Sequence, residues 1–163
     1  MTGTVSVRQV AEGKHESGDE LLQLVSFNIG DEEFGVDILQ VQEINRMLEV
    51  TKVPNAPEYV DGVINLRGKV IPVMDLRSRL SLARKPHDKH TRIVVVELSG
   101  KVIGFVVDAV REVLRIPLNV TEPAPSITGS VSEDYIKGVG KLDDMLLILL
   151  DLEKLMLTPA RAA

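Results

Sequence analysis

The sequence predicts a mainly β protein, folded as a small barrel or a pair of barrels with only short helices. Short runs of Val, Ile, Leu and Phe are separated along the chain by turn residues, which is the pattern of strands joined by hairpins. Helical periodicity is scarce, and several hairpins of short strands favour closed barrels over one open sheet. Some apolar runs do not alternate with polar residues, which indicates strands that are covered on both faces.

Four segments have the signature of a β-hairpin, because each contains two apolar runs around a tight turn. Glycine or aspartate at the tips supplies the backbone conformations that such turns need. The predicted strands are 21–29 with 33–37, 60–66 with 69–74, 92–98 with 101–108, and 141–150 folded back at Asp143-Asp144.

Three short helices are expected between and after the strands. Residues 38–44 have apolar side chains at helical spacing after Asp37, a possible N-terminal cap. Residues 76–82 and 151–156 are the other two candidates. The apolar runs 93–96 and 102–107 are expected to lie between two packed barrels, and no repeat of 20–50 residues is visible.

Composition weakens three common classes of function. The chain has 163 residues, with 19 Lys and Arg against 24 Asp and Glu, which gives a net charge of -5. An acidic chain with three Phe, two Tyr and no Trp has little with which to bind and stack nucleic acid. The absence of cysteine excludes disulfides, thiolate metal sites and cysteine nucleophiles.

No segment of the sequence predicts membrane insertion. The first 18 residues lack the apolar core of a signal peptide. The longest apolar runs are far shorter than the roughly 20 residues that a spanning helix needs. A cytoplasmic protein is therefore expected.

The sequence offers no convincing catalytic, cofactor or metal site. His87 and His90 have a spacing that could place both on one metal, but they lie in a polar segment after Pro86 without a third ligand nearby. The segment Gly138-Val139-Gly140-Lys141 lacks both the earlier glycine and the Ser or Thr of a phosphate-binding loop. No serine has a nucleophile-elbow motif around it. We expect no enzyme activity, no cofactor and no metal.

Arg67 is the most informative surface candidate. It stands in Asn65-Leu66-Arg67-Gly68, at the tip of a hairpin whose strands are apolar. It could be an ordinary solvated tip residue, or an arginine held for a carboxylate or carbonyl of a partner. The residues alone thus predict a small-barrel binding module, and a barrel that binds a small molecule or an oligonucleotide stays open as the alternative.

A long ordered series of segments resembles the CheW family of bacterial chemotaxis coupling proteins. The likeness spans about residues 20–157, which is more specific than any one short motif. The matching segments are FNIGDEEFGVDI (27–38), VQEI (41–44), VPNAP (53–57), YV (59–60), GVINLRG (62–68), IPVMDLR (71–77), GFVVDAV (104–110), YIKGVG (135–140) and LILLDL (147–152).

The resemblance implies a non-enzymatic adaptor made of two SH3-like five-stranded barrels on a shared apolar core, with short helices. One barrel is expected to take about residues 21–69 plus 141–157, and the other about 70–140. A flexible arm (1–20) and a tail (158–163) are expected to flank this domain. The implied partners are the regulatory domain of the histidine kinase CheA and the hairpin tip of chemoreceptors, and the isolated chain is expected to be a monomer.

Six positions correspond to partner contacts of the family. Gly62 matches its kinase-facing surface, and the others match the receptor groove between the two barrels or its surroundings: Val41, Glu43, Asn65, Arg67 and Val113. Because their charges are opposite, we predict that Glu43 and Arg67 pair across the groove, within about 6 Å of each other.

Overall fold

The computed structural model describes residues 21–80, 82–83, 85–117, 121–122, 135–142 and 145–157. The expected N-terminal arm (1–20) and C-terminal tail (158–163) lie outside these ranges. The strands are β1 (Leu21–Ile29), β2 (Glu32–Asp37), β3 (Val41–Arg46), β4 (Val60–Leu66), β5 (Lys69–Asp75), β6 (Arg92–Leu98), β7 (Lys101–Val107), β8 (Ala109–Pro117), β9 (Thr121–Glu122), β10 (Ile136–Leu142) and β11 (Met145–Leu150). The helices are the 3-10 turn η1 (Ile38–Gln40), α2 (Leu76–Arg79) and α3 (Leu152–Leu157).

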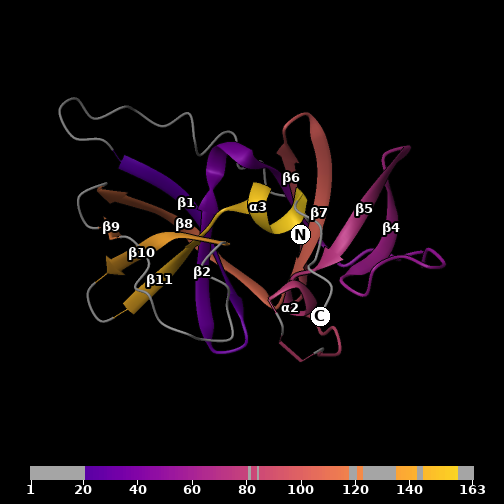
Figure 1. Ribbon diagram of the computed structural model, residues 1–163, viewed down its shortest axis with the longest axis horizontal. Coiled ribbons are helices and arrows are strands. Elements are labelled where there is room, and N and C mark those ends of the chain that lie inside the picture. Colours follow the sequence, from indigo (N-terminus) through magenta and orange to yellow (C-terminus); the bar gives the residue numbers. More distant parts are fainter. Residues whose placement is uncertain are drawn as a thin grey trace.

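The described strands form two sheets that lie side by side. The six-stranded sheet has the order β8-β1-β2-β11-β10-β9 and the five-stranded sheet the order β3-β6-β7-β5-β4. Neighbouring strands are antiparallel except for the parallel pairs β2–β11 and β5–β7. Figure 1 shows the six-stranded sheet on the left and the five-stranded sheet on the right, with α3 between them.

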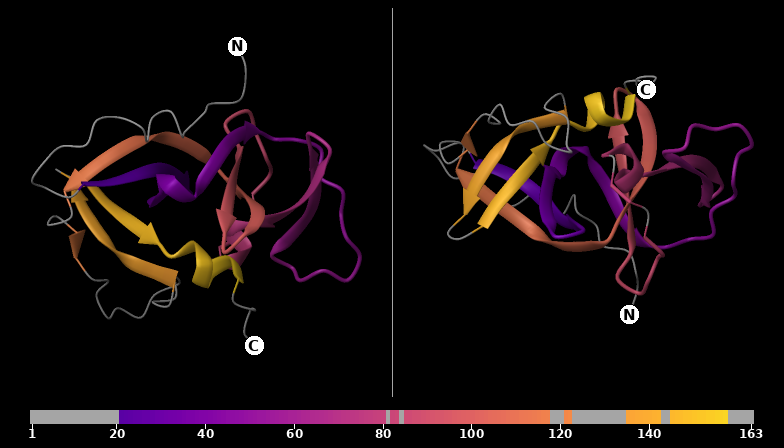
Figure 2. Two further views of the ribbon diagram at one scale, coloured as in Figure 1. Left: turned by 90° about the horizontal axis from the view of Figure 1, so that it is seen from above. Right: turned by 60° about the horizontal axis from the view of Figure 1, so that its bottom comes forward.

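The strand pairs of the predicted hairpins are confirmed. Each is an antiparallel pair, namely β1–β2, β4–β5, β6–β7 and β10–β11. The turn expected at Asp143-Asp144 lies outside the described residues. Figure 2 shows that each sheet curls on itself, and each has an apolar cluster of its own, so the predicted pair of β subdomains is present. One sheet has six strands instead of the expected five, because the two-residue strand β9 adds to its edge.

The sheets divide the chain differently from the expected boundaries. Strands β3 and β4 belong with β5, β6 and β7, so the five-stranded sheet takes residues 41–107 instead of 70–140. Strands β8, β9 and β10 belong to the same sheet as β1 and β2. The division depends on the long-range pairs β3–β6 and β1–β8, and no local pattern in the sequence specifies such partners.

Apolar side chains form one core between the sheets and one core inside each sheet. Strand β6 shows how this explains its unbroken apolar run. Val94 and Val96 face the core shared by the sheets, whereas Ile93 and Val95 face the core inside the five-stranded sheet. All four side chains are fully buried, which confirms that both faces of the strand are covered.

Three phenylalanines join the two sheets at the shared core. Phe27 of β1 lies 6.0 Å from Phe34 of β2 and 5.5 Å from Phe105 of β7, measured between ring centroids. All three rings are fully buried. The chain has no other phenylalanine, so all three of its phenylalanine rings stabilise the contact between the two sheets.

Two of the three expected helices form. Helix α2 begins after Asp75, whose side chain accepts a hydrogen bond from the Arg77 N–H, and α3 begins after Asp151. The helix expected over 38–44 was wrong. Asp37 does accept a hydrogen bond from the Leu39 N–H, but the chain makes only the turn η1 and then enters β3 at Val41, because pairing with β6 outweighs weak helical periodicity.

Candidate partner-binding surface

Glu43 and Arg67 lie on opposite edges of the five-stranded sheet. Glu43 is on the edge strand β3, and Arg67 is at the tip of the hairpin that joins the other edge strand, β4, to β5. Arg67 Nη2 donates a hydrogen bond to Glu43 Oε2, so the predicted ion pair is confirmed. The pair connects two edges of the same sheet and does not span the gap between the two sheets, contrary to the expectation.

The two partners of this pair differ greatly in exposure. The Arg67 side chain is 68% exposed, whereas the Glu43 side chain is 10% exposed. The hydrogen bond with Glu43 and the charge of that carboxylate raise the pKa of Arg67. Glu43 Oε1 is buried and has no hydrogen-bond partner among the described residues. The arrangement presents a solvated guanidinium that is oriented by a buried carboxylate.

The backbone of the β4–β5 turn fixes the position of Arg67. Arg67 and Gly68 both have left-handed conformations, with φ of 52° and 85°. The Asn65 side chain accepts a hydrogen bond from the Gly68 N–H at 2.9 Å. Asn65 therefore shapes the turn that carries Arg67, which is a structural role for a residue predicted to contact partners.

Gly62 is required by a close approach of two backbone segments. It has φ of 152° and sits at a bulge of β4, and a Cβ atom there would lie 2.2 Å from the Thr51 carbonyl oxygen. Thr51 exchanges two backbone hydrogen bonds with Val63, at 2.9 and 2.8 Å. This bridge explains the glycine without any partner.

The two valines predicted at the groove pack against the core shared by the two sheets instead of forming an exposed surface with the ion pair. Val41 begins β3 but is 5% exposed, because its side chain lies in the core shared by the two sheets. Val113 is on β8 of the six-stranded sheet, where it pairs with Val25 and packs, partly buried, against the shared core. Of the six predicted contact residues, the structure thus joins Glu43 to Arg67 and sets Asn65 and Gly62 on the same hairpin.

Sequence reasoning missed the ion pair between Arg77 and Asp108. Arg77 Nε and Nη2 donate to the two carboxylate oxygens at 3.1 and 2.6 Å, and the Gly30 N–H donates to Oδ2 at 2.7 Å. Burial opposes ionisation of Asp108, but the hydrogen bonds from Arg77 and Gly30 outweigh it, so the pKa of Asp108 is lowered. The carboxylate connects the β1–β2 turn to α2, which belong to different halves of the fold. An aspartate that follows an apolar run is also what simple strand termination gives, so the sequence carries no signal for this pair.

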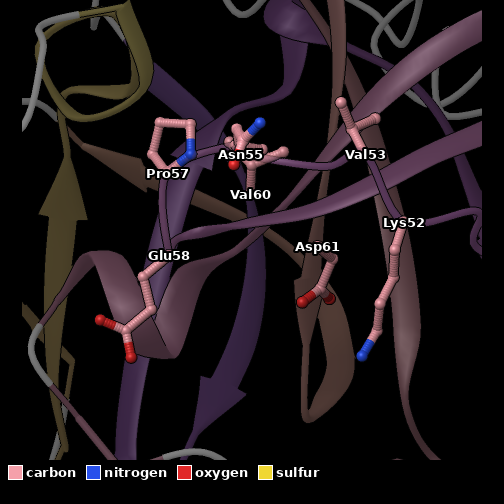
Figure 3. Close-up of a pocket in the computed structure, with 8 residues that line it drawn as sticks. Lys52, Val53, Asn55, Pro57, Glu58, Val60 and Asp61 are labelled. Carbon is pink, nitrogen blue, oxygen red and sulfur yellow. The ribbon is translucent and has the colours of Figure 1, made fainter.

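A surface hollow of about 370 Å³ lies beside β4, along residues 52–61 (Figure 3). Its lining includes Lys52, Glu58 and Asp61 together with Val53 and Pro57. In Figure 3 the Glu58 carboxylate points away from Asp61 and Lys52, so these charges do not converge on one point. The hollow lacks the convergent polar groups of an orienting ligand site.

Among the described residues, no group of three His, Asp or Glu side chains comes close enough to hold a metal ion. Within the same ranges, no helix has the length and apolar character needed to span a membrane.

Comparison with known proteins gives a family and close relatives. The model of the CheW-like domain matches residues 23–159. The chain is 37% identical to the chemotaxis protein CheW of Klebsiella aerogenes, over 96% of this chain and 91% of that protein. It is 38% identical to the chemotaxis protein CheW of Helicobacter pylori, over 90% of this chain and 88% of that protein.

A solved structure agrees with the fold. The crystal structure of the scaffolding protein TtCheW from Thermoanaerobacter tengcongensis has a TM-score of 0.79 and 38% identity to this chain. The likeness covers 83% of this chain and 92% of TtCheW, so it includes both sheets and their shared core. Sequence, domain model and fold therefore agree, and the chain belongs to the CheW family.

Proposed function

We propose that the chain is a non-enzymatic adaptor that couples chemoreceptors to the histidine kinase CheA in a cytoplasmic chemotaxis array. The observation that carries this proposal is the extent of the family match. The CheW-like domain takes up residues 23–159 and leaves no described part of the chain for a separate catalytic unit. The relatives named above are chemotaxis proteins, and TtCheW is named a scaffolding protein.

The ion pair on the five-stranded sheet supports a receptor contact at this surface. Arg67 is exposed but oriented, so it can meet a carboxylate or carbonyl of a helical partner without first losing its own freedom. Exposed apolar side chains lie on the neighbouring elements: Leu39 of η1 is 81% exposed and Val70 of β5 is 71% exposed. A helix that docks on a surface uses this combination of apolar burial and a few orienting charges.

The energies of such contacts suit a reversible signalling complex. Burial of one Val70-sized side chain gives on the order of 1–2 kcal/mol. An exposed ion pair adds about 0–1 kcal/mol, so Arg67 sets register and partner choice more than affinity. Val41, which is already buried in the free chain, has little surface left to contribute. Many weak contacts repeated in an array would supply the required strength through multivalency.

A reconstituted signalling complex tests this proposal. The chain is mixed with CheA and with a chemoreceptor cytoplasmic fragment displayed on vesicles, and phosphorylation of CheA from ATP is measured. We expect the chain to raise kinase activity only when the receptor fragment is present, and Arg67→Glu to reduce this activation by at least about tenfold. Because Arg67→Glu sets a second carboxylate beside the nearly buried Glu43, the folded fraction of this variant is measured by circular dichroism and activation is compared per folded molecule.

A matched control is available on another hairpin. Lys101 is an exposed cation beside the β6–β7 turn, so Lys101→Glu makes the same charge change away from the ion pair. We expect Lys101→Glu to leave activation unchanged. If the wild-type chain fails to bind either CheA or the receptor fragment, the adaptor proposal is wrong. If both glutamate variants behave alike, the adaptor role stands but Arg67 is not a specific contact.

The alternative of a barrel that binds a small molecule or an oligonucleotide gains no support from the hollow in Figure 3. Two carboxylates and one ammonium group line it, a charge balance that disfavours a nucleic-acid backbone.

A further inference from the structure

The two halves of the chain repeat one structural unit. Tyr59 precedes β4, and its carbonyl accepts a hydrogen bond from the Asp75 N–H at 2.8 Å. Tyr135 precedes β10, and its carbonyl accepts a hydrogen bond from the Asp151 N–H, also at 2.8 Å. Each aspartate then begins a short helix, α2 or α3. Tyr135 follows Tyr59 by 76 positions, and Asp151 follows Asp75 by the same interval.

Strand pairing repeats with the same spacing. The β4–β5 hairpin has a register shift just before Gly62, and the β10–β11 hairpin has one just before Gly138. The second strand of each hairpin then forms a parallel pair with another strand. The parallel partners include Val73 with Gly104 in one half and Leu149 with Gly35 in the other. The segments 59–79 and 135–155 are therefore equivalent parts of the two halves.

Arg79 and Leu155 are the equivalent residues of these two segments, 76 positions apart, and they contact each other. Arg79 Nε donates a hydrogen bond to the Leu155 carbonyl oxygen at 2.7 Å. The guanidinium also lies over the two equivalent tyrosine rings, 5.1 Å from the centroid of Tyr59 and 4.8 Å from that of Tyr135. Arg79 is 7% exposed, so the interaction is shielded from water.

We propose that Arg79 is a positioning residue that fixes the orientation of the two sheets relative to each other and so couples the partner surfaces on the two halves. The coupling part of this proposal rests on the proposed adaptor function. Arg79 belongs to the helix that follows β5 of the five-stranded sheet, whereas Tyr135 and Leu155 flank β10 and β11 of the six-stranded sheet. One guanidinium thus contacts both halves at the place where equivalent segments meet.

The physical reason is the directionality of these contacts. The apolar core between the sheets provides most of the attraction, but hydrophobic burial is non-directional and tolerates small rotations. A planar guanidinium stacked on two rings and bonded to a carbonyl has one preferred orientation. A lysine side chain has the same charge but no planar group, so it cannot stack on both rings and bond the carbonyl in this orientation.

The orientation of the sheets can be measured in the isolated protein. Residual dipolar couplings of backbone amides in the two sheets report their relative orientation without any partner. We expect Arg79→Met to stay folded, because the flexible methionine side chain fills much of the same buried space, and to change the orientation by more than the uncertainty of the wild-type measurement. Arg79→Lys should show an intermediate change. Arg111→Met, which removes an exposed arginine of β8, is the matched control and should leave the orientation unchanged.

Binding and kinase activation test the coupling. For Arg79→Met we expect the dissociation constants for CheA alone and for the receptor fragment alone to stay within about threefold of wild type, while activation in the ternary complex falls by at least about tenfold. Loss of a merely stabilising residue would weaken both binding affinities and the activation together, in step with the fraction of folded protein. If Arg79→Met fails to fold, Tyr135→Leu and Arg79→Lys carry the same test, since each removes only part of the contact.

Three results would overturn the proposal. The first is an unchanged orientation in every folded variant. The second is a loss of activation that follows the loss of stability. The third is an Arg79→Lys variant that behaves as wild type in both assays. A wild-type chain that does not couple receptor to kinase would refute the adaptor function and leave the dipolar-coupling result on Arg79 intact.

Discussion

Arg67 donates a hydrogen bond to Glu43 across the two edges of the five-stranded sheet, with the arginine in water and the glutamate almost buried. This difference makes the pair asymmetric. Loss of Glu43 leaves a guanidinium that water solvates well. Loss of Arg67 leaves a buried carboxylate without its cation, which is the more costly defect.

The first prediction follows from that asymmetry. Glu43→Gln should change the free energy of unfolding by less than about 1 kcal/mol, and Arg67→Ala should lower it by more than Glu43→Gln does. The double variant should be more stable than Arg67→Ala alone. Urea unfolding of the three variants measures these values. Equal losses for the two single variants would contradict the proposed burial of the carboxylate.

The second prediction concerns Asp108, whose pKa is lowered by Arg77 and Gly30. Asp108→Asn should lower the free energy of unfolding at neutral pH by about 1–3 kcal/mol, because it replaces a charge-assisted pair. A carboxylate whose pKa is lowered by folding stabilises the folded protein at pH values above its unfolded-state pKa, near 3.9. This stabilisation is lost as the pH falls through the folded-state pKa. The difference in the free energy of unfolding between wild type and variant should therefore be constant above about pH 5 and shrink at lower pH.

Urea unfolding between pH 7 and the lowest pH at which both proteins fold checks this behaviour. Asp31→Asn, which changes an exposed carboxylate of the neighbouring β1–β2 turn, is the matched control and should leave stability nearly unchanged. If the difference in the free energy of unfolding between wild type and Asp108→Asn stays constant down to acid pH, Asp108 does not act through its charge.

The third prediction separates two roles of Gly62. Gly62→Ala should destabilise the protein by about 3 kcal/mol or more, because a Cβ atom would clash with the Thr51 carbonyl oxygen. Gly68→Ala should cost only about 1 kcal/mol, since nothing lies within 4 Å of its Cβ position and only the backbone conformation is strained. Thermal unfolding followed by circular dichroism compares them. A stable Gly62→Ala variant that no longer bound CheA would show a direct contact role instead.

The fourth prediction tests the two covered faces of β6. Val94→Ala and Val95→Ala should each cost about 2 kcal/mol, because one valine faces the core between the sheets and the other faces the core inside the five-stranded sheet. Gln42→Ala, on the exposed face of β3, is the reference and should have little effect. A large difference between the two valine variants would mean that one face of β6 is not closely packed.

The sequence predicted the hairpins well because both strands and their turn are neighbours along the chain. Turn residues such as Ser99 and Gly100, which have φ of 50° and 80°, are chosen for local conformation, and local conformation can be read from sequence. The unbroken apolar run of β6 also predicted its two covered faces correctly.

Long-range relationships could not be read in this way. Nothing around Val41 specifies that β3 pairs with β6, so the helix and the subdomain boundaries expected there were wrong. The repeat of the two halves retains few identities, chiefly a tyrosine, a Gly-Val pair and an Asp-Leu pair, and was not visible without the matching hydrogen bonds.

The candidate site was predicted in part. Opposite charges correctly suggested that Glu43 and Arg67 pair, but the sequence could not show that the arginine is exposed and the glutamate nearly buried. Val41 is an apolar residue two positions before Glu43, and only the packing of β3 shows that it points into the core. Arg79 gave no signal at all, since its partners come from three distant segments.

The order of the strands has a consequence for synthesis. The five-stranded sheet is an insertion within the six-stranded one, because β1 and β2 precede it and β8 to β11 follow it. On the ribosome, the inserted sheet has all its strands once residue 107 has emerged. The β1–β2 hairpin, with its two phenylalanines, must wait for β11 at the other end of the nascent chain before its own sheet can be completed.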